Sequence, residues 1–307
     1  MLNNVLILLE AAPLVYSFIL GLLVGSFLNV VILRLPRQLQ YEWTEQCKIW
    51  LSDSGNTHTN KSNDNQETAE PEPNSEEKTP PPGVVKEGSH CPKCNAAIKP
   101  WHNIPVLSYI VLGGKCANCK TRISVRYPLI ELFTAGLSAL VIHHFGISAQ
   151  GGFALLLTWA LVALTFIDFD HQLLPDNIVL PFLWLGLLLS LFPIFANPND
   201  AIIGAVAGYM SLWLVFQLFK LITGKEGMGF GDFKLLALFG AWLGWQMLPQ
   251  IIFISTLLGS IIGISLMALK IIKRDKPIPF GPYISTAGFI ALLWGEEINQ
   301  LYLSSLF

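Results

Sequence analysis

The sequence predicts an all-α polytopic membrane protein with about eight transmembrane helices and a cytoplasmic zinc-ribbon-like domain between the first and the second. Of its 307 residues, 52% are hydrophobic and 13% are charged, whereas about a quarter of the residues of soluble domains are charged. The hydrophobic residues gather in stretches close to the length of about 20 that crosses a bilayer. Two Cys-x-x-Cys pairs in the one long polar loop indicate the zinc domain.

Eight apolar stretches are the candidate spans, and positive charge gives their orientation. They cover residues 14–33, 128–146, 152–167, 177–196, 201–222, 234–248, 250–269 and 281–295, of which 152–167 and 234–248 are short for a full crossing. All 19 Lys and Arg lie in the loops after the first, third, fifth and seventh spans or at their edges. Because cytoplasmic loops hold the positive charges, both termini are expected on the outer side of the membrane. The first stretch lacks a positively charged start and is expected to be retained as a span.

The long loop, residues 38–127, separates the first transmembrane helix (1–37) from a seven-helix membrane domain (128–307). In its first part, residues 38–51, aromatic and leucine side chains recur at the spacing typical of a helix. This helix is expected either along the membrane surface or packed on the protein. The polar, proline-containing stretch 52–83 cannot bury much apolar surface, so we expect a disordered tether there.

Four cysteines in residues 90–126 have the spacing of a structural zinc site. Cys91 and Cys94 form one Cys-x-x-Cys knuckle, and Cys116 and Cys119 form a second. Two such knuckles complete a tetrahedral Zn²⁺ shell. The competing interpretations are two disulfides, which a cytoplasmic loop disfavours, or a redox pair, whereas two matched pairs favour metal. Cys47 is interpreted as an incidental thiol.

Two acidic clusters lie at the cytoplasmic ends of predicted spans, where ionisable side chains are costly and mark candidate sites. The first is IDFDHQLLPD, with Asp168, Asp170, His171 and Asp176, and the second is GMGFGD, with Gly227, Gly229, Gly231 and Asp232. Two facing carboxyl groups that share a proton can activate water and protonate a carbonyl. The glycines are expected to let a substrate backbone approach Asp232, or to adopt positive φ and aim it inward.

Helix capping is the simpler interpretation of these acids. Asp176 precedes the fourth span and suits either an N-cap or a site role. Asp232 taken alone also suits a cap, and Asp170 and His171 suit solvated positions at the interface. A proton-coupled transporter that uses paired membrane-edge aspartates is the alternative function, and a structural scaffold is a third. The acids lie at the membrane edge instead of the mid-bilayer position typical of transporter sites.

A resemblance then narrows the function. Gly-Phe-Gly-Asp232 is similar to the GxGD signature of membrane aspartic proteases. Together with GSFLNVVILRLP (25–36), the two cysteine pairs, RYPLIEL (126–132), IDFDHQLLPD (167–176) and PIPFGPY (277–283), the chain resembles the bacterial type IV prepilin peptidases along nearly its whole length. The insert at 52–83 departs from the family pattern without disturbing these motifs.

The resemblance implies a bifunctional enzyme of the bacterial inner membrane, so the outer side of the membrane is the periplasm. Family members cleave the leader of prepilins and pseudopilins at the cytoplasmic membrane face, then methylate the new N-terminal residue with S-adenosylmethionine. By motif, the catalytic aspartates are Asp168 and Asp232, supported by Gly229, Gly231 and Asp176. The expected partners are these substrates and the lipid bilayer, with no nucleic acid, and the sequence leaves the oligomeric state open.

The methyltransferase half has no strand-borne GxGxxG motif of the usual cofactor-binding kind. The resemblance points instead to the N-terminal stretch and the zinc domain, with Gly25, Asn29, Arg34 and Glu131 as candidate cofactor-binding residues. Two of them have a simpler interpretation, since Gly25 suits close helix packing and Arg34 suits anchoring to lipid headgroups.

Overall fold

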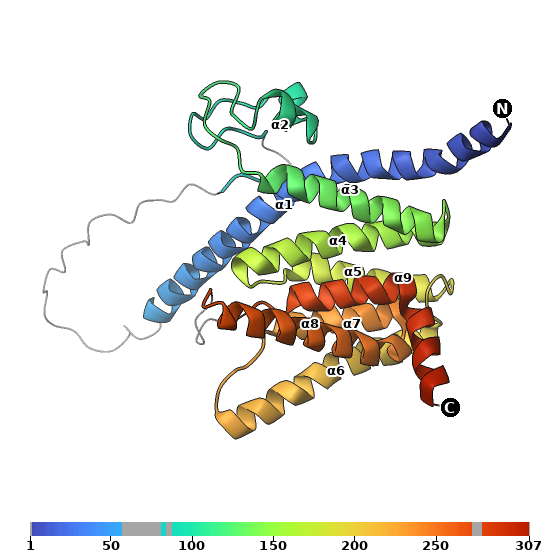
Figure 1. Cartoon of the computed structure of the whole chain (residues 1–307). Helices are drawn as coiled ribbons and strands as arrows, with labels where there is room; N and C mark the ends of the chain where they lie inside the picture. The colour runs from blue at the N-terminus through green and yellow to red at the C-terminus, as the bar shows by residue number, and fades with distance from the viewer. Residues whose placement is uncertain (1, 57–80, 84–87, 272–277, 307) are drawn as a thin grey trace, which may run out of the picture.

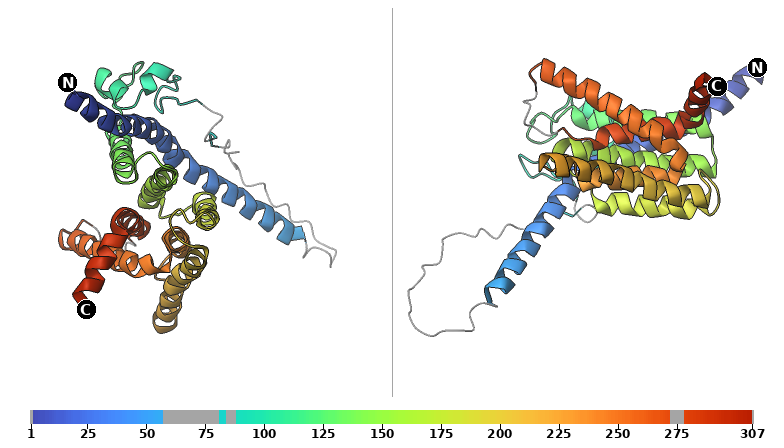
Figure 2. Two further views of the ribbon diagram at one scale, coloured as in Figure 1. Left: turned by 90° about the vertical axis from the view of Figure 1, so that its right-hand side faces the viewer. Right: turned by 90° about the horizontal axis from the view of Figure 1, so that it is seen from below.

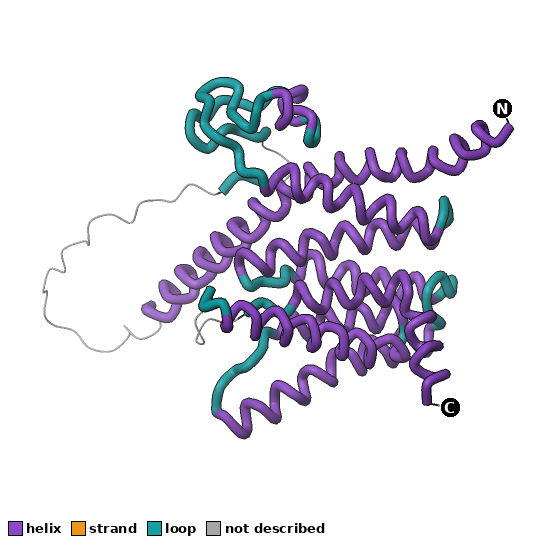
Figure 3. Tube along the Cα trace, in the orientation of Figure 1, coloured by secondary structure: helices purple, strands orange, loops and turns teal. Residues whose placement is uncertain are grey.

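The computed structural model describes residues 2–56, 81–83, 88–271 and 278–306, and this part of the chain is almost entirely helical (Figures 1 and 3). The long helices are α1 (Leu2–Asn56), α3 (Arg126–Phe145), α4 (Ala149–His171), α5 (Asp176–Ser190), α6 (Pro198–Thr223), α7 (Phe230–Leu243), α8 (Leu248–Ala268) and α9 (Gly281–Leu306). Short helices are η1 (Pro100–Asn103), α2 (Leu107–Val111) and η2 (Trp245–Met247). Extended pairing within these residues is limited to two isolated bridges beside the cysteines. The predicted all-α membrane fold is confirmed.

Each of the eight predicted spans is a helix, although the lengths differ from those predicted. Five segments within the described residues are long and apolar enough to cross a membrane, in α1, α3, α4, α6 and the η2–α8 unit. The third span, predicted as 152–167, is a helix of 23 residues, so the sequence underestimated its length. In contrast, α5 has 15 residues and α7 has 14.

The short helix α7 lies inside the bundle, among α5, α6 and α9. Its side chains are apolar on all sides, as expected for a helix that neighbours surround, and Phe233, Leu235 and Phe239 have no exposed surface. Close backbone contact fixes it against α6, because a Cβ on Gly240 would lie 2.1 Å from the Gly204 carbonyl oxygen. Helix α7, which carries Asp232 in its first turn, is therefore fixed in position among its neighbours.

Helix α1 is much longer than the predicted first transmembrane helix, residues 1–37, and its predicted span, residues 14–33. Its first half packs on α3 and α4, with Leu28 and Ile32 buried in a cluster that includes Ile130 of α3 and Ile167 of α4. The helix continues through Pro36 to Asn56 and leaves the bundle at one end (Figures 1 and 2). Leu39 is still buried, and beyond it the helix is free-standing and mostly exposed up to residue 51, so the expected packing on the protein is found only at the start of residues 38–51.

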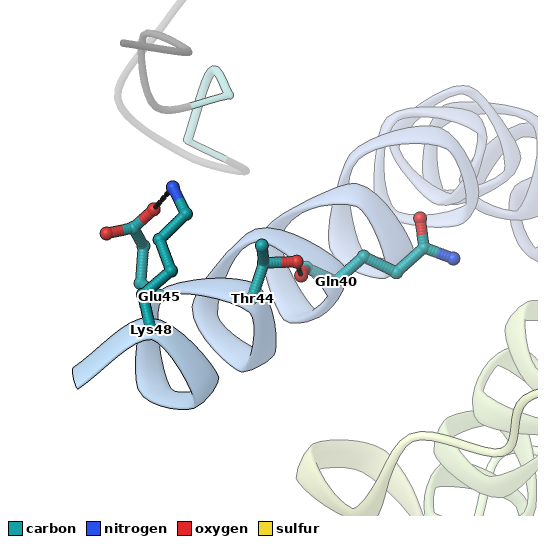
Figure 4. Close-up of polar contacts among 4 residues, drawn as sticks. All are labelled: Gln40, Thr44, Glu45 and Lys48. Atoms are coloured by element: carbon teal, nitrogen blue, oxygen red, sulfur yellow. Dashed lines mark hydrogen bonds and ion pairs between the residues drawn. The ribbon is translucent and has the colours of Figure 1, made fainter. Parts of the chain in front are cut away.

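The free-standing part of α1 shows local contacts along its surface (Figure 4). The Thr44 hydroxyl donates to the Gln40 carbonyl over 2.7 Å, and Lys48 pairs with Glu45 over 2.7 Å. The helix also includes residues 52–56, which were predicted to begin the tether, while residues 57–80 lie outside the described part of the chain.

The C-terminal end of α4 and the N-terminal ends of α7 and α9 lie at the same end of the bundle (Figure 1). Both chain termini lie toward the opposite end (Figure 1). This arrangement brings together segments that are more than 50 residues apart in the sequence.

Candidate active site

Asp168 lies in the last turn of α4, where its side chain is only 5% exposed. The helix ends at His171, and Gln172 closes it in the left-handed conformation, with its N–H donating to the Asp168 carbonyl over 2.9 Å. The Asp168 carboxylate accepts a hydrogen bond of 3.0 Å from the N–H of Gly281, the first residue of α9. Backbone N–H groups at a helix start lack intrahelical partners and favour an anion. Helix α9 therefore supplies a fixed donor to this carboxylate.

Asp232 is the third residue of α7 and is 8% exposed. Asp232 Oδ2 lies 3.9 Å from the position of a Cβ on Gly229, and the Asp232 carboxyl group is close enough to Asp168 for their charges to interact. The two aspartates, separated by 64 residues, are thus neighbours at the same end of the bundle. The sequence prediction that their clusters meet agrees with this geometry.

Leu174 joins the elements that carry the two aspartates. A Cβ placed on Gly231 would lie 2.8 Å from the Leu174 Cβ, and one placed on Gly281 would lie 3.1 Å from its Cδ2. The buried Leu174 side chain is therefore packed between the start of α7 and the start of α9. A change in either glycine moves a segment that positions an aspartate.

The three glycines before Asp232 have different environments. Gly227 approaches the Phe219 ring and Gly231 approaches Leu174, each at a distance that excludes a side chain. At Gly229, a Cβ would have only Asp232 Oδ2 within 4 Å, at 3.9 Å. None of the three has positive φ, so the expectation that positive φ aims Asp232 inward is wrong. Gly229 alone leaves open space beside the carboxylate.

Two ion pairs flank the aspartates. Lys234 Nζ lies 2.7 and 2.8 Å from the two carboxylate oxygens of Asp176 and joins α7 to the start of α5. Asp176 makes no side-chain cap, since Pro175 is the N-cap residue. On the other side, the Arg126 guanidinium donates to both oxygens of Asp170. This second pair joins the start of α3 to the last turn of α4.

The four cysteine sulfurs converge in a second site, outside the bundle. Their Sγ atoms all lie within 4.8 Å of one another, and those of Cys91 and Cys119 are 3.7 Å apart. Four sulfurs at about 2.3 Å around zinc form a tetrahedron with edges of about 3.8 Å. All four cysteines are free thiols, so the sulfur positions fit a metal and the disulfide interpretation is not supported.

The two knuckles have the same local geometry. In the first, the N–H of Asn95 donates to the Cys91 carbonyl over 2.9 Å; in the second, the N–H of Lys120 donates to the Cys116 carbonyl over 3.1 Å. Asn95 and Lys120 both have positive φ, at 55° and 57°. Hydrogen bonds from Thr121 lower the pKa of the Cys119 thiol to about 6, which favours the thiolate that binds metal.

The four candidate cofactor residues lie where α1, α3 and the zinc domain meet. A Cβ on Gly25 would be 2.8 Å from the Glu131 Cα, which shows close helix packing. The Asn29 side chain donates to the Tyr127 carbonyl over 3.2 Å. The buried Glu131 carboxylate accepts from the Val106 N–H over 2.8 Å. Arg34 donates to two carbonyls just before the cysteines, those of Gly83 and Gly88.

The paired carboxylates allow a definite chemistry. Two neighbouring carboxyl groups that share one proton can remove a proton from water and donate one to a peptide carbonyl. The open space at Gly229 adjoins this pair, at one end of a membrane bundle. The fold and the pair together have the form of a membrane-embedded aspartic protease.

Comparisons with known proteins agree with this class. Residues 19–145 match the bacterial peptidase A24 N-terminal domain, and residues 155–264 match the type IV leader peptidase family. A protein named prepilin leader peptidase/N-methyltransferase from Pseudomonas aeruginosa is 51% identical over 298 residues, which cover 96% of each chain. Proteins of the same name from Stutzerimonas stutzeri and Legionella pneumophila are 48% and 42% identical, with 96% and 92% of each chain covered. No solved structure gives a significant match. The chain therefore belongs to the type IV leader peptidase family.

Two residues of the candidate site were not selected from the sequence, Gly281 and Leu174. Leu174 lies inside the quoted IDFDHQLLPD motif and Gly281 inside PIPFGPY. A glycine followed by proline at the start of a predicted span indicates a helix N-terminus without a side chain. That signal was present, but it does not say which acid the helix start contacts.

Proposed function

We propose that this protein cleaves the leader peptide of type IV prepilins and type II secretion pseudopilins, and then methylates the new N-terminal residue. The relatives' names support both activities. The observation that carries the peptidase half is the pairing of two buried aspartates, Asp168 and Asp232, across the ends of α4 and α7. No observation on the described residues favours a transporter.

In the proposed reaction the scissile peptide bond lies in the open space beside Gly229. One carboxyl group of the pair takes a proton from a water molecule as that water attacks the peptide carbonyl carbon. The other carboxyl group protonates the carbonyl oxygen, and the tetrahedral intermediate then breaks its C–N bond as a proton reaches the leaving amine. The pair titrates as one unit, so acid and base roles are assigned to the pair. Gly281 holds Asp168 in place, and the Lys234–Asp176 pair fixes α7 relative to α5.

We propose that Cys91, Cys94, Cys116 and Cys119 bind a structural Zn²⁺ ion. Four thiolates leave no open position on a tetrahedral ion, so the metal would stabilise the domain and take no part in the reaction. A divalent ion bound by both knuckles would close the chain between them into a loop. The chain that leaves this loop continues directly to Arg126 at the start of α3.

The methyl donor proposed is S-adenosylmethionine, whose sulfonium supplies a transferable methyl group. Gly25, Asn29, Arg34 and Glu131 remain the candidate residues, because the structure groups them and gives the site a buried carboxylate that suits a cationic ligand. Glu131→Gln is expected to weaken binding of the cofactor in calorimetry. Unchanged affinity in that variant would remove Glu131 from the site.

We further propose that the end of the bundle that carries the aspartates faces the cytoplasm, with both termini periplasmic. The Lys and Arg residues support this orientation because they follow the positive-inside rule. The zinc domain, residues 90–126, then lies on the cytoplasmic side with the active site, between the first span and the seven-helix domain 128–307.

The proposal is tested by incubating the purified protein with a prepilin, with and without S-adenosylmethionine, and weighing the product by mass spectrometry. Without the cofactor, the product is expected to have the mass of the prepilin without its leader and no added methyl group. With it, the shortened product gains the mass of one methyl group. A prepilin that keeps its leader in both reactions would refute the peptidase assignment, and a shortened but unmethylated product would refute the methyltransferase assignment.

A further inference from the structure

The chain between the two cysteine knuckles presents an apolar surface that the protein leaves uncovered. This interknuckle segment, residues 98–111, contains η1 and α2. Its exposed apolar side chains are Ile98, Trp101, Ile104, Leu107, Ile110 and Val111, of which Leu107, Ile110 and Val111 are 62%, 67% and 83% exposed. A contiguous exposed apolar surface generally marks a contact with a membrane or a partner.

The position of the segment places this surface beside the membrane bundle. The Val106 N–H, between η1 and α2, donates to Glu131. Glu131 is the sixth residue of α3, so the contact lies about 7 Å along a helix that crosses the membrane. The zinc domain correspondingly lies beside α1 and α3 (Figures 1 and 2). Its apolar surface is therefore level with the membrane edge.

The charge of the domain favours a lipid surface over other partners. From residue 88 to residue 125 the sequence has no Asp or Glu, and it has five cationic residues, Lys93, Lys99, Lys115, Lys120 and Arg122. Four thiolates around a divalent ion would carry two negative charges, so positive charge remains in surplus. Lys99 Nζ lies 5.4 Å from the centre of the Trp101 ring. Tryptophan is enriched at membrane interfaces, and basic residues next to a membrane attract anionic lipids.

We propose that the interknuckle segment inserts its apolar surface into the headgroup region of the bilayer beside α3, while Lys99, which lies over the Trp101 ring, binds anionic headgroups. The bilayer contact then adds to the chain link to α3 and the Val106–Glu131 hydrogen bond, which also hold the domain. This proposal does not depend on the peptidase or the methyltransferase activity.

The experiment is spin-label accessibility of the full-length protein in lipid nanodiscs. A nitroxide is attached at Val111→Cys or, separately, at Leu107→Cys, in a Cys47→Ser background that removes the exposed free thiol. The matched control carries the label at Arg122→Cys, an exposed cationic position in the same domain. The metal content of each variant verifies that the cysteine site is intact. The relaxation rate of each nitroxide is measured with oxygen, which concentrates in lipid, and separately with a water-soluble nickel chelate.

We expect oxygen to be the more effective relaxing agent at positions 107 and 111 and the nickel chelate at position 122. Nanodiscs with anionic headgroups are expected to increase this difference between positions 107 and 111 and position 122, relative to nanodiscs of purely zwitterionic lipids. Nickel accessibility at 107 and 111 equal to that at 122, with metal content unchanged, would overturn the proposal. A loss of nickel accessibility only when a prepilin is added would also overturn it, because the surface would then bind a protein.

Discussion

Substitution of Gly281 by alanine tests how the structure positions Asp168. The added Cβ would lie 2.7 Å from Asp168 Oδ2, 3.1 Å from Leu174 Cδ2 and 3.2 Å from Asp168 Cγ. Real carbon–oxygen contacts are longer, so either α9 or the carboxylate must move and the 3.0 Å hydrogen bond from the Gly281 N–H is lost. A hydrogen bond to a charged group contributes about 1.5–3 kcal/mol. If the whole of this contribution is lost in the transition state of cleavage, the cleavage rate falls by about 10- to 150-fold.

The assay is the initial rate of leader cleavage by the purified Gly281→Ala variant in nanodiscs. Gly152→Ala is the matched control: Gly152 lies in α4, the helix that carries Asp168, and a Cβ there would meet nothing within 4 Å. The control is expected to cleave at the parent rate. If Gly281→Ala also cleaves at the parent rate while its thermal unfolding is unchanged, the proposed positioning of Asp168 by α9 is refuted.

Two further predictions concern the ion pair between α3 and α4 and the four-cysteine site. Arg126→Asp or Asp170→Arg alone is expected to reduce the cleavage rate a few-fold, because a partly exposed ion pair contributes only about 0–1 kcal/mol. The double variant, which restores the pair with its charges exchanged, should recover most of the rate. A double variant that cleaves no faster than either single variant would contradict this prediction. Replacing Cys91 and Cys94 with serine is expected to remove the bound zinc, measured by elemental analysis, and to destabilise the zinc domain. Undiminished zinc content in that variant would refute the four-cysteine site.

The sequence was sufficient to predict the helices and the two acidic clusters. Long apolar stretches can satisfy their backbone groups in lipid only as helices or barrels, and their length here favours helices. The distribution of Lys and Arg along the chain predicts that Asp168 and Asp232 lie at the same membrane edge. Spacing alone did not distinguish Asp168 from Asp170, whereas the structure does: Asp168 is buried beside Asp232, and Asp170 pairs with Arg126.

The sequence was insufficient where a contact joins distant segments. The hydrogen bond from Gly281 to Asp168 crosses 113 residues, and no local pattern states which helix start meets which acid. The length of α1 was also missed, because a proline inside a helix removes a backbone hydrogen bond and generally breaks or kinks it, yet α1 continues through Pro36. The glycines before Asp232 were given the same two alternative roles as a group, and only the packing distances distinguish Gly229 from the others.

The most direct test of the central claim is a comparison of Asp168→Asn, Asp232→Asn and the double variant, with cleavage measured by mass spectrometry of the prepilin. If the two carboxyl groups act as one unit, each single variant is expected to lose as much activity as the double variant, without loss of the folded protein. Cleavage at the parent rate in either single variant, or a double-variant loss equal to the product of two partial losses, would contradict a shared catalytic pair.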